Sequence, residues 1–389
     1  MGQSSISEQM AHRASSFSKP AVAVLGSHSA LDICSGARKF GLPNLVVCQL
    51  GRDKIYSKNY KVRNAGGIGT GGNGPDSSFG CVEDVLLLDK FADIAKKPAL
   101  DILFKKQAIF IPHRSFSVYV GYDKIEKEFE VPILGNRWLL RAEERNTPKN
   151  QHYLLEKAGV RVPKTFAKPE DIDTLCIIKA PEAKRSYERA FFFASNYDGY
   201  KQESQRMLNS GVINEAGLKG ALIEEFVLGA QFNFNFFLSP LSGELELLGI
   251  DTRRQTNLDG VLRLPAREQL KLPASTRINN IEVGHIACTL RESLLEQVFE
   301  VGEKFVHAVK KEYPPGPIGP FALQGAIAPA ERGEEILIFD VSFRVPGSPG
   351  TRFTPYPNYL YGQSVSVGER IAMEIKEAAG RKRLGDIVT

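Results

Sequence analysis

The chain has 389 residues, of which 42% are hydrophobic, and carries a formal net charge of +5 from 50 basic and 45 acidic residues. This length allows two or three domains with real cores, and the composition excludes a disordered or fibrous protein. The basic residues are dispersed among acidic ones, which favours small anionic ligands over nucleic acid.

The patterns of apolar residues and cysteines favour a cytoplasmic protein. No stretch is apolar over the roughly 18 residues that a membrane helix needs, and the polar first 19 residues lack the apolar segment of a secretory signal. No CxxC pair occurs among the five cysteines, so we expect buried thiols and neither a zinc site nor disulfides. Residues 1–19 are expected to be a flexible extension.

The first domain is expected to contain a parallel sheet. Apolar runs at residues 21–25 and 45–50 are typical of strands, and residues 29–40 between them predict a helix. Further strands at 85–88 and 108–112 extend this domain over residues 20–125. A strand–helix–strand unit of this spacing builds a parallel sheet, so ligands should bind at the carboxyl ends of its strands.

A glycine-rich stretch interrupts this domain. Residues 63–80 (RNAGGIGTGGNGPDSSFG) contain almost nothing apolar, which predicts a mobile surface loop. Gly67, Gly69 and Gly72 match the GxGxxG spacing of phosphate-binding turns, but no strand precedes them and Pro75 prevents a helix from following directly. A linker is therefore the simpler interpretation, and a phosphate lid is the alternative.

The next part of the chain predicts a compact α+β unit. Residues 126–147 are expected to connect the first domain to this unit, which spans residues 148–227. Its expected elements are two helices at 150–158 and 202–210 and three strands at 174–180, 190–194 and 221–227.

Residues 228–389 predict a third domain. Alternating apolar and polar residues at 233–239 and 243–253 are typical of antiparallel strands. The later expected elements are a long helix with an apolar stripe at 290–311, strands at 321–326 and 335–341, and a helix at 367–379. The fold class is therefore a combination of α/β and α+β, with an N-terminal parallel sheet.

Polar residues after two strands of the first domain are candidates for binding an anion. His28 lies between the first strand and its helix, where backbone N–H groups and the helix dipole favour a phosphate. It would hydrogen-bond that phosphate or merely cap the helix. Ser115 follows another strand and would face the same crevice if the two strands are neighbours, but a turn serine is the alternative.

Several residues of the α+β unit are candidates for binding a nucleotide. Lys179 ends an apolar strand, where it is placed to reach phosphates or is simply solvated. The basic loop at 182–189 would hold phosphate by side-chain charge. Lys149 is a second phosphate ligand or an exposed residue at a helix start. The end of the strand IEEFV would meet ribose and adenine, or would be solvated, and its candidates are Glu224, Glu225, Phe226 and Val227.

Two polar residues lie inside otherwise apolar strands near the C-terminus. Gln324 in PFALQGA and Asp340 in LIFDVSFR would be costly to bury without a partner. Magnesium binds few protein oxygens and completes its shell with water and phosphate, so one carboxylate and one amide oxygen fit it. The alternative is a buried ion pair between Asp340 and Arg344.

Motifs along most of the chain resemble one family. They include LGSHSALDIC, AIFIPHRSFSVYVGYD, VPILGNRWLLRAEE, IEEFVLGAQFNFNFF, LLGIDTRRQTNLDGVLRLPA and YPPGPIGPFALQ, and the similarity covers residues 20–389. These segments are similar to archaeal formate-dependent 5-formaminoimidazole-4-carboxamide ribonucleotide synthetase, a family of late purine biosynthesis. The resemblance implies a three-domain ATP-grasp architecture.

The resemblance also implies an activity and its residues. The family joins formate to 5-aminoimidazole-4-carboxamide ribonucleotide (AICAR) through formyl phosphate, with ATP and magnesium or manganese, and makes the formamido product FAICAR for IMP synthesis. It places His28, Ser115 and Asn257 at substrate positions, Glu225 at an ATP position, and Gln324 and Asp340 at the metal. Arg344 is a candidate catalytic residue, and we expect a homo-oligomer.

One loop differs from the family pattern and keeps two alternatives open. Residues 346–351 (PGSPGT) stand where the family has a Gly-Gly-Thr-Asn type loop, near the metal and the reacting groups. A paralogue with the same chemistry on another small carboxylate or amine is therefore the second hypothesis. A non-catalytic nucleotide-binding protein is the third, and the set Lys179, Glu225, Gln324 and Asp340 argues against it.

Overall fold

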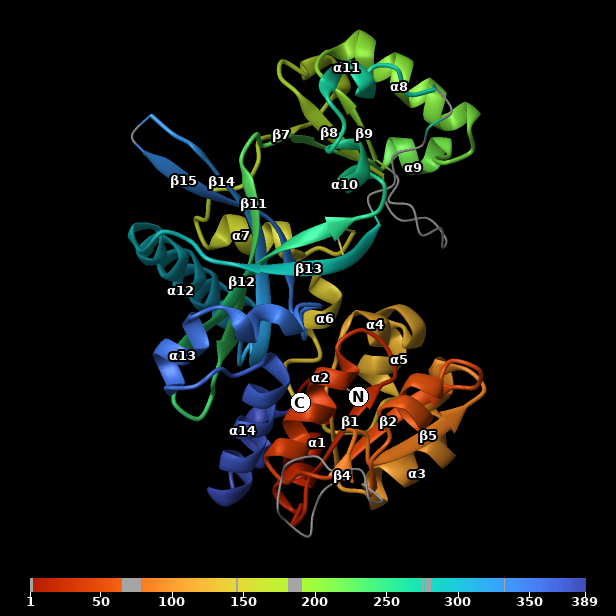
Figure 1. The fold of residues 1–389 in the computed structure, drawn as a ribbon, viewed down its shortest axis with the longest axis vertical. Coiled ribbons are helices and arrows are strands. Elements are labelled where there is room, and N and C mark those ends of the chain that lie inside the picture. The colour runs from red at the N-terminus through yellow and green to blue at the C-terminus, as the bar shows by residue number, and fades with distance from the viewer. Residues whose placement is uncertain are drawn as a thin grey trace.

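The computed structural model describes residues 3–64, 78–144, 146–180, 191–273, 276, 281–331 and 333–389. In this part of the chain the strands form one parallel sheet, two antiparallel sheets and a two-stranded ribbon. The parallel sheet, the five-stranded sheet and the small sheet follow one another along the long axis (Figure 1). Among these residues, no helix combines the length and apolar character needed to cross a membrane.

The first sheet confirms the predicted parallel arrangement. Its order is β5-β2-β1-β6, with β1 (Ala21–Leu25), β2 (Asn44–Gln49), β5 (Asp84–Leu88) and β6 (Ala108–Phe110). Every residue of β1 is buried. The helices of this region are α2 (Ala30–Lys39), α3 (Lys97–Lys105), α4 (Arg114–Val120), α5 (Tyr122–Lys127) and α6 (Leu139–Ala142).

The N-terminal segment differs from the expected loose extension. Residues Gln3–Ser15 form helix α1, which packs against the short helix at Leu384–Ile387. Ile6, Met10 and Ala14 are buried, and their spacing of four residues puts them on one helix face. The surrounding polar residues concealed this narrow apolar stripe in the sequence.

Two short paired strands lie at the two ends of the glycine-rich stretch. Strands β3 (Arg63–Asn64) and β4 (Ser78–Phe79) pair in antiparallel fashion, where the sequence predicted only a loop. Residues 65–77, with Gly67, Gly69 and Gly72, lie outside the described residues.

A small antiparallel sheet forms the predicted α+β unit. Its order is β7-β10-β8-β9, with β7 (Thr165–Phe166), β8 (Cys176–Lys179), β9 (Phe191–Ala194) and β10 (Leu222–Glu225). Helices α8 (Tyr197–Asn209) and α9 (Glu215–Lys219) pack on it. Helices α10 (Leu258–Val261) and α11 (Ala266–Gln269), which follow β12 in the chain, appear at the same end of the molecule in Figure 1. Ile178, Phe192 and Ile223 belong to its separate apolar core.

The largest sheet is antiparallel and holds five strands in the order β13-β12-β11-β14-β15. They are β11 (Ala230–Leu238), β12 (Leu245–Gln255), β13 (Glu282–Cys288), β14 (Gly319–Pro329) and β15 (Glu334–Ser342). Helix α12 (Leu295–Glu312) packs on this sheet through Val298, Phe305 and Val309. Strand β13 was not predicted, because none of its seven residues is buried and its sequence (EVGHIAC) does not alternate between apolar and polar residues.

Two helices pack outside the domains to which the sequence analysis assigned them. Helix α7 (Gln151–Lys157), with Asn150 as its N-cap, buries Leu154 and Leu155 in the core of the five-stranded sheet. Helix α14 (Val367–Gly380) follows α13 (Tyr356–Tyr361) and packs mainly against α2 of the first domain.

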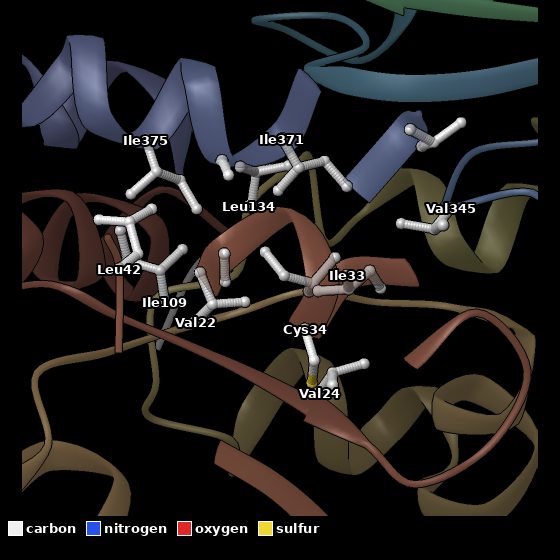
Figure 2. Close-up of a cluster of buried hydrophobic side chains, with 14 of the residues drawn as sticks. Val22, Val24, Ile33, Cys34, Leu42, Ile109, Leu134, Val345, Ile371 and Ile375 are labelled. Atoms are coloured by element: carbon white, nitrogen blue, oxygen red, sulfur yellow. The ribbon is translucent and has the colours of Figure 1, made fainter. Parts of the chain in front are cut away.

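The contact between α14 and α2 is unusually close. An added Cβ at Gly36 would lie 2.2 Å from the carbonyl carbon of Gly368, so only glycine fits there. Figure 2 shows Ile371 and Ile375 of α14 in the same apolar cluster as Val22 of β1. The end of the chain therefore anchors the first domain to the rest of the molecule.

Candidate active site

One cleft of about 2050 Å³ is lined by residues of the parallel sheet's loops, the small sheet and the five-stranded sheet. It brings together nine of the predicted site residues, which are His28, Lys179, Glu224, Glu225, Phe226, Val227, Gln324, Asp340 and Arg344. Ser115, Lys149 and Asn257 do not line the cleft as the described residues define it.

His28 lies at the first-domain end of the cleft in a left-handed backbone conformation, with φ 52°. Its ring stacks on His113 with centroids 5.4 Å apart, and its Nδ1 lies 2.9 Å from Ser29 Oγ. Ser29 in turn donates a hydrogen bond of 2.9 Å to the carbonyl oxygen of Pro346. Burial, with His113 beside it, lowers the pKa of His28 to about 3, so the ring is neutral at pH 7.

Ser115 lies in the first turn of α4 and meets the turn after β1. Its hydroxyl donates a 2.9 Å hydrogen bond to Ser27 Oγ, and β1 and β6 are neighbours in the sheet. The two strand ends therefore face the same region, as the sequence analysis required for a shared crevice.

Two other predicted residues lie elsewhere. Lys149 forms a 2.7 Å ion pair with Glu312 of α12, which matches the alternative of an exposed residue at a helix start. Asn257 is the N-cap residue of α10 and has a left-handed backbone, with φ 33°.

The nucleotide candidates lie at the ends of β8 and β10. The Lys179 ammonium forms an ion pair with the buried carboxylate of Glu224, and its Nζ lies 6.0 Å from the ring centroid of Phe339. Glu225 accepts a 3.2 Å hydrogen bond from the backbone of Lys164. The Phe226 N–H already donates to the carbonyl of Leu175, and residues 181–190, which include the predicted basic loop, lie outside the described residues.

Gln324 and Asp340 are directly opposite each other on β14 and β15, and both line the cleft. The Gln324 amide oxygen accepts a hydrogen bond from Arg253, and its nitrogen donates to Ser342 Oγ at 3.3 Å. An amide oxygen has two lone pairs, so it can also approach a cation. The described residues hold no group of three or more His, Cys, Asp or Glu suited to a metal. One carboxylate and one amide oxygen are hard oxygen ligands of the kind that magnesium binds in small number.

Arg344 pairs with a residue that the sequence analysis did not select. Its Nε donates a 3.2 Å hydrogen bond to Glu143 Oε2, and the other carboxylate oxygen accepts 2.8 Å from the backbone of Phe343. Arg114 lies 3.7 Å from the same carboxylate. Burial raises the pKa of Glu143, while Arg344 and Arg114 oppose this rise.

A second polar cluster that sequence reasoning missed lies on β11, β12 and β13. Asp251 is fully buried and lies 2.5 Å from Nδ1 of His285. Its two oxygens also accept 2.7 Å hydrogen bonds from Asn233 and Asn235. The signal for Asn233, Asn235 and Asp251 was present in the sequence, because they lie inside largely apolar strands just as Gln324 does. Nothing in the sequence indicated that His285 is their partner.

The loop at 346–351 reaches this cluster. A Cβ built on Gly347 would lie 3.1 Å from Nε2 of His28 and 3.3 Å from Nε2 of His285. The loop that differs from the family pattern therefore joins the two histidines of the cleft.

Two family models match the chain, and so do named relatives. Residues 22–166 match "Protein of unknown function (DUF1246)" and residues 199–389 match "Domain of unknown function (DUF1297)". The 5-formaminoimidazole-4-carboxamide-1-(beta)-D-ribofuranosyl 5'-monophosphate synthetase of Methanopyrus kandleri is 37% identical over 95% of this chain and 94% of its own. The synthetase of the same name from Methanothermobacter thermautotrophicus is 36% identical over the same shares. The chain belongs to this synthetase family.

A solved structure agrees with this assignment. The IMP biosynthesis protein PurP from Thermococcus kodakaraensis is 27% identical, has a TM-score of 0.67, and aligns over 95% of this chain and all of its own. The N5-carboxyaminoimidazole ribonucleotide synthetase purK, at 11% identity and a TM-score of 0.54 over 85% of this chain and 72% of its own, shares the fold. Membership of the synthetase family confirms the resemblance, the ATP-grasp architecture and the prediction of an ATP-dependent ligase.

Proposed function

We propose that the cleft of this synthetase catalyses the ATP- and formate-dependent formylation of AICAR to FAICAR, in the synthesis of IMP. The observation that carries the proposal is the cleft itself. Side chains from three sheets, which belong to segments far apart in the sequence, meet around one space that is large enough for a nucleotide and a ribonucleotide together.

The reaction needs two displacements. A formate oxygen attacks the γ-phosphorus of ATP, the bond from that phosphorus to the bridging oxygen breaks, and ADP leaves. The amine of AICAR then attacks the formyl carbon, the bond from that carbon to the phosphate oxygen breaks, and the nitrogen loses a proton. Because the lone pair of this amine is delocalised into the imidazole carboxamide, positioning must contribute strongly to the second step.

The residues divide between the two substrates. His28 would bind the ribonucleotide phosphate at the carboxyl ends of β1 and β6, where Ser115 donates a hydrogen bond to Ser27. Lys179 would meet the ATP phosphates, and Glu224 and Glu225 would lie at the nucleotide end of the cleft, which all three residues line. Asn257 is assigned to the ribonucleotide by the family resemblance, although it does not line the cleft that the described residues form.

A divalent cation completes the site. The Asp340 carboxylate and the Gln324 amide oxygen would hold magnesium or manganese, since both are hard oxygen ligands on facing strands. When bound, the cation supplies positive charge next to the transferring phosphoryl group. Arg344 and Lys179 add fixed positive charge from the protein on the same cleft. A cytoplasmic location and a homo-oligomeric state remain predictions.

The test is product formation from isotopically labelled formate. Purified protein given ATP, magnesium, [¹³C]formate and AICAR should release ADP and phosphate and form FAICAR with one labelled carbon, without any folate. Omission of any single component should stop product formation. ATP and AICAR binding without label incorporation, at any formate concentration, would contradict the proposal and favour a paralogue acting on another carboxylate or amine.

A further inference from the structure

A histidine and an arginine on neighbouring strands contact one carboxylate at the wall of the cleft. Arg253 of β12 and His285 of β13 are opposite each other in the antiparallel register. His285 Nε2 lies 2.7 Å from Oε1 of Glu282, and Arg253 Nε lies 2.9 Å from Oε2 of the same side chain. All three residues line the cleft, and the Glu282 side chain is 33% exposed. The pair therefore contacts both oxygens of a carboxylate at a place that a ligand can reach.

The buried end of the cluster keeps His285 positively charged. Burial acts to raise the pKa of Asp251, but His285 and the hydrogen bonds from Asn233 and Asn235 outweigh it and lower this pKa. Its ionised carboxylate faces His285 Nδ1 at 2.5 Å. Burial disfavours the charge on His285, but the hydrogen bonds to Asp251 and Glu282 raise its pKa to about 9. Both ring nitrogens therefore donate at neutral pH.

His285 and Arg253 lie between the proposed cation site and the proposed ribonucleotide site. On one side, the Arg253 guanidinium donates to the amide oxygen of Gln324, next to the proposed cation site. On the other side, a Cβ at Gly347 would lie 3.1 Å from His28 Nε2 and 3.3 Å from His285 Nε2. A small carboxylate held here has the phosphoryl donor on one side and the ribonucleotide on the other.

We propose that His285 and Arg253 form the formate subsite and that Glu282 occupies it until formate displaces it. The inference rests on the proposed function. Formate presents the same two oxygens as the Glu282 carboxylate, so the exchange leaves neither cation unpaired. The displaced Glu282 lies at the exposed edge of the cleft and can be hydrated there.

The charge of the subsite has a chemical reason. Formate must approach the polyphosphate of ATP, and two anions at contact distance repel each other strongly where water is partly excluded. Cationic donors on the far side of the carboxylate offset this repulsion. His28 is neutral and contributes no charge, so at the point where the two histidines converge the positive charge comes from His285.

The first experiment compares KM values for formate. His285→Asn keeps an amide donor for the buried Asp251 but removes the Nε2 donor and the positive charge. The KM for formate should rise by about tenfold to a hundredfold, the usual effect of losing one charged hydrogen bond. The Kd values of AICAR and ATP, measured by calorimetry, should change by no more than about twofold. A higher KM for formate with unchanged Kd values for AICAR and ATP distinguishes the loss of a formate subsite from a general loss of structure.

The second experiment weakens the internal competitor. Glu282→Gln keeps the shape of the side chain and removes its charge, so the KM for formate should fall by a few-fold. Glu334→Gln is the matched control, because Glu334 is an exposed carboxylate 2.6 Å from Arg291 and outside the cleft. The control should leave the KM for formate unchanged.

A third measurement reports binding directly. In spectra of ¹⁵N-labelled histidine, the His285 signal, identified by its loss in His285→Asn, should show an imidazolium at pH 7 and shift on titration with formate. In this series, wild-type protein that incorporates no labelled formate contradicts the proposed function. An active wild type whose His285→Asn variant keeps its KM for formate overturns the subsite instead. A Glu282→Gln variant with a higher KM for formate overturns it as well.

Discussion

The two walls of the cleft carry their polar groups in different ways. On the parallel-sheet wall these groups follow the ends of strands, as His28 does after β1 and Arg114 does at the start of α4 after β6. On the five-stranded wall they lie inside strands, as Asp251 and Gln324 do. After β1 the first wall presents a neutral histidine, and the second wall presents ionised groups that bond one another.

The difference fits the two tasks of a ligase. The ribonucleotide keeps its charge throughout the reaction, so its phosphate can be held by hydrogen-bond donors and backbone N–H groups. Phosphoryl transfer redistributes charge, so it gains from fixed ions in a rigid frame. A substitution on one wall should therefore leave the function of the other wall intact.

The largest effect is expected for Asp340→Asn on the charged wall. Turnover should fall at least about a hundredfold, the order of effect seen when one group that stabilises transition-state charge is lost. AICAR binding should survive, because the ribonucleotide lies mainly on the other wall. Steady-state turnover over a range of magnesium concentrations, with calorimetry for AICAR, measures both. Normal turnover with normal magnesium dependence would show that Asp340 has only a structural role.

A smaller effect is expected for His28→Ala on the parallel-sheet wall. Its Kd for AICAR should rise by about tenfold, the cost of one lost hydrogen bond to a charged group, while the Kd of ATP should stay within about twofold. Calorimetric titration of each ligand tests this. An equal loss of affinity for both ligands would mean that His28 only supports the fold through Ser29 and the Pro346 carbonyl.

The charge of His285 predicts a pH effect on one substrate only. Its pKa is raised to about 9, so the imidazolium is present at pH 7 and is lost as the pH rises through 9. The charged and titratable groups that face it are Asp251, Glu282, Arg253 and His28. The pKa of Asp251 is lowered, Glu282 and Arg253 form an ion pair with each other, and His28 is already neutral.

The KM for formate should therefore rise between pH 8 and 10, toward about tenfold for each pH unit above the pKa of His285. The KM for ATP over the same range is the internal control for the phosphate side. The His285→Asn variant should have a high KM for formate that no longer follows this titration. A wild-type KM for formate that stays constant from pH 8 to 10 would contradict the role of the imidazolium.

Groups whose position depends on local chain order could be predicted from the sequence. His28 and Lys179 follow or end apolar strands, and the ends of strands in one sheet meet ligands. Gln324 and Asp340 were found because a lone polar residue in an apolar strand needs a partner, and the register confirms that they face each other.

Groups whose position depends on strand pairing could not be predicted. The contact between Asp251 and His285 requires β12 and β13 to pair in one register, and a shift by one residue would turn each side chain to the other face. All side chains of strand β13 are exposed or half-buried, so its sequence has no apolar pattern from which a strand could be predicted. The pairing of Glu143 with Arg344 likewise joins residues from distant segments. Such contacts arise from packing and have no local signal.

The smallest effect is expected outside both walls, in the glycine-rich stretch. Deleting residues 66–74 leaves residues 65 and 75–77 to join β3 and β4, a length that suits an antiparallel hairpin. The deleted residues are mostly glycine, so their removal costs little buried apolar surface, and a shorter connection changes the closure entropy only slightly. Turnover and Tm should therefore stay close to those of the full chain. A deletion protein with an unchanged Tm but without ATP turnover would instead support the phosphate-lid interpretation of Gly67, Gly69 and Gly72. Substituting the same residues by an equal number of serines separates the two explanations, because it keeps the length and removes the GxGxxG spacing.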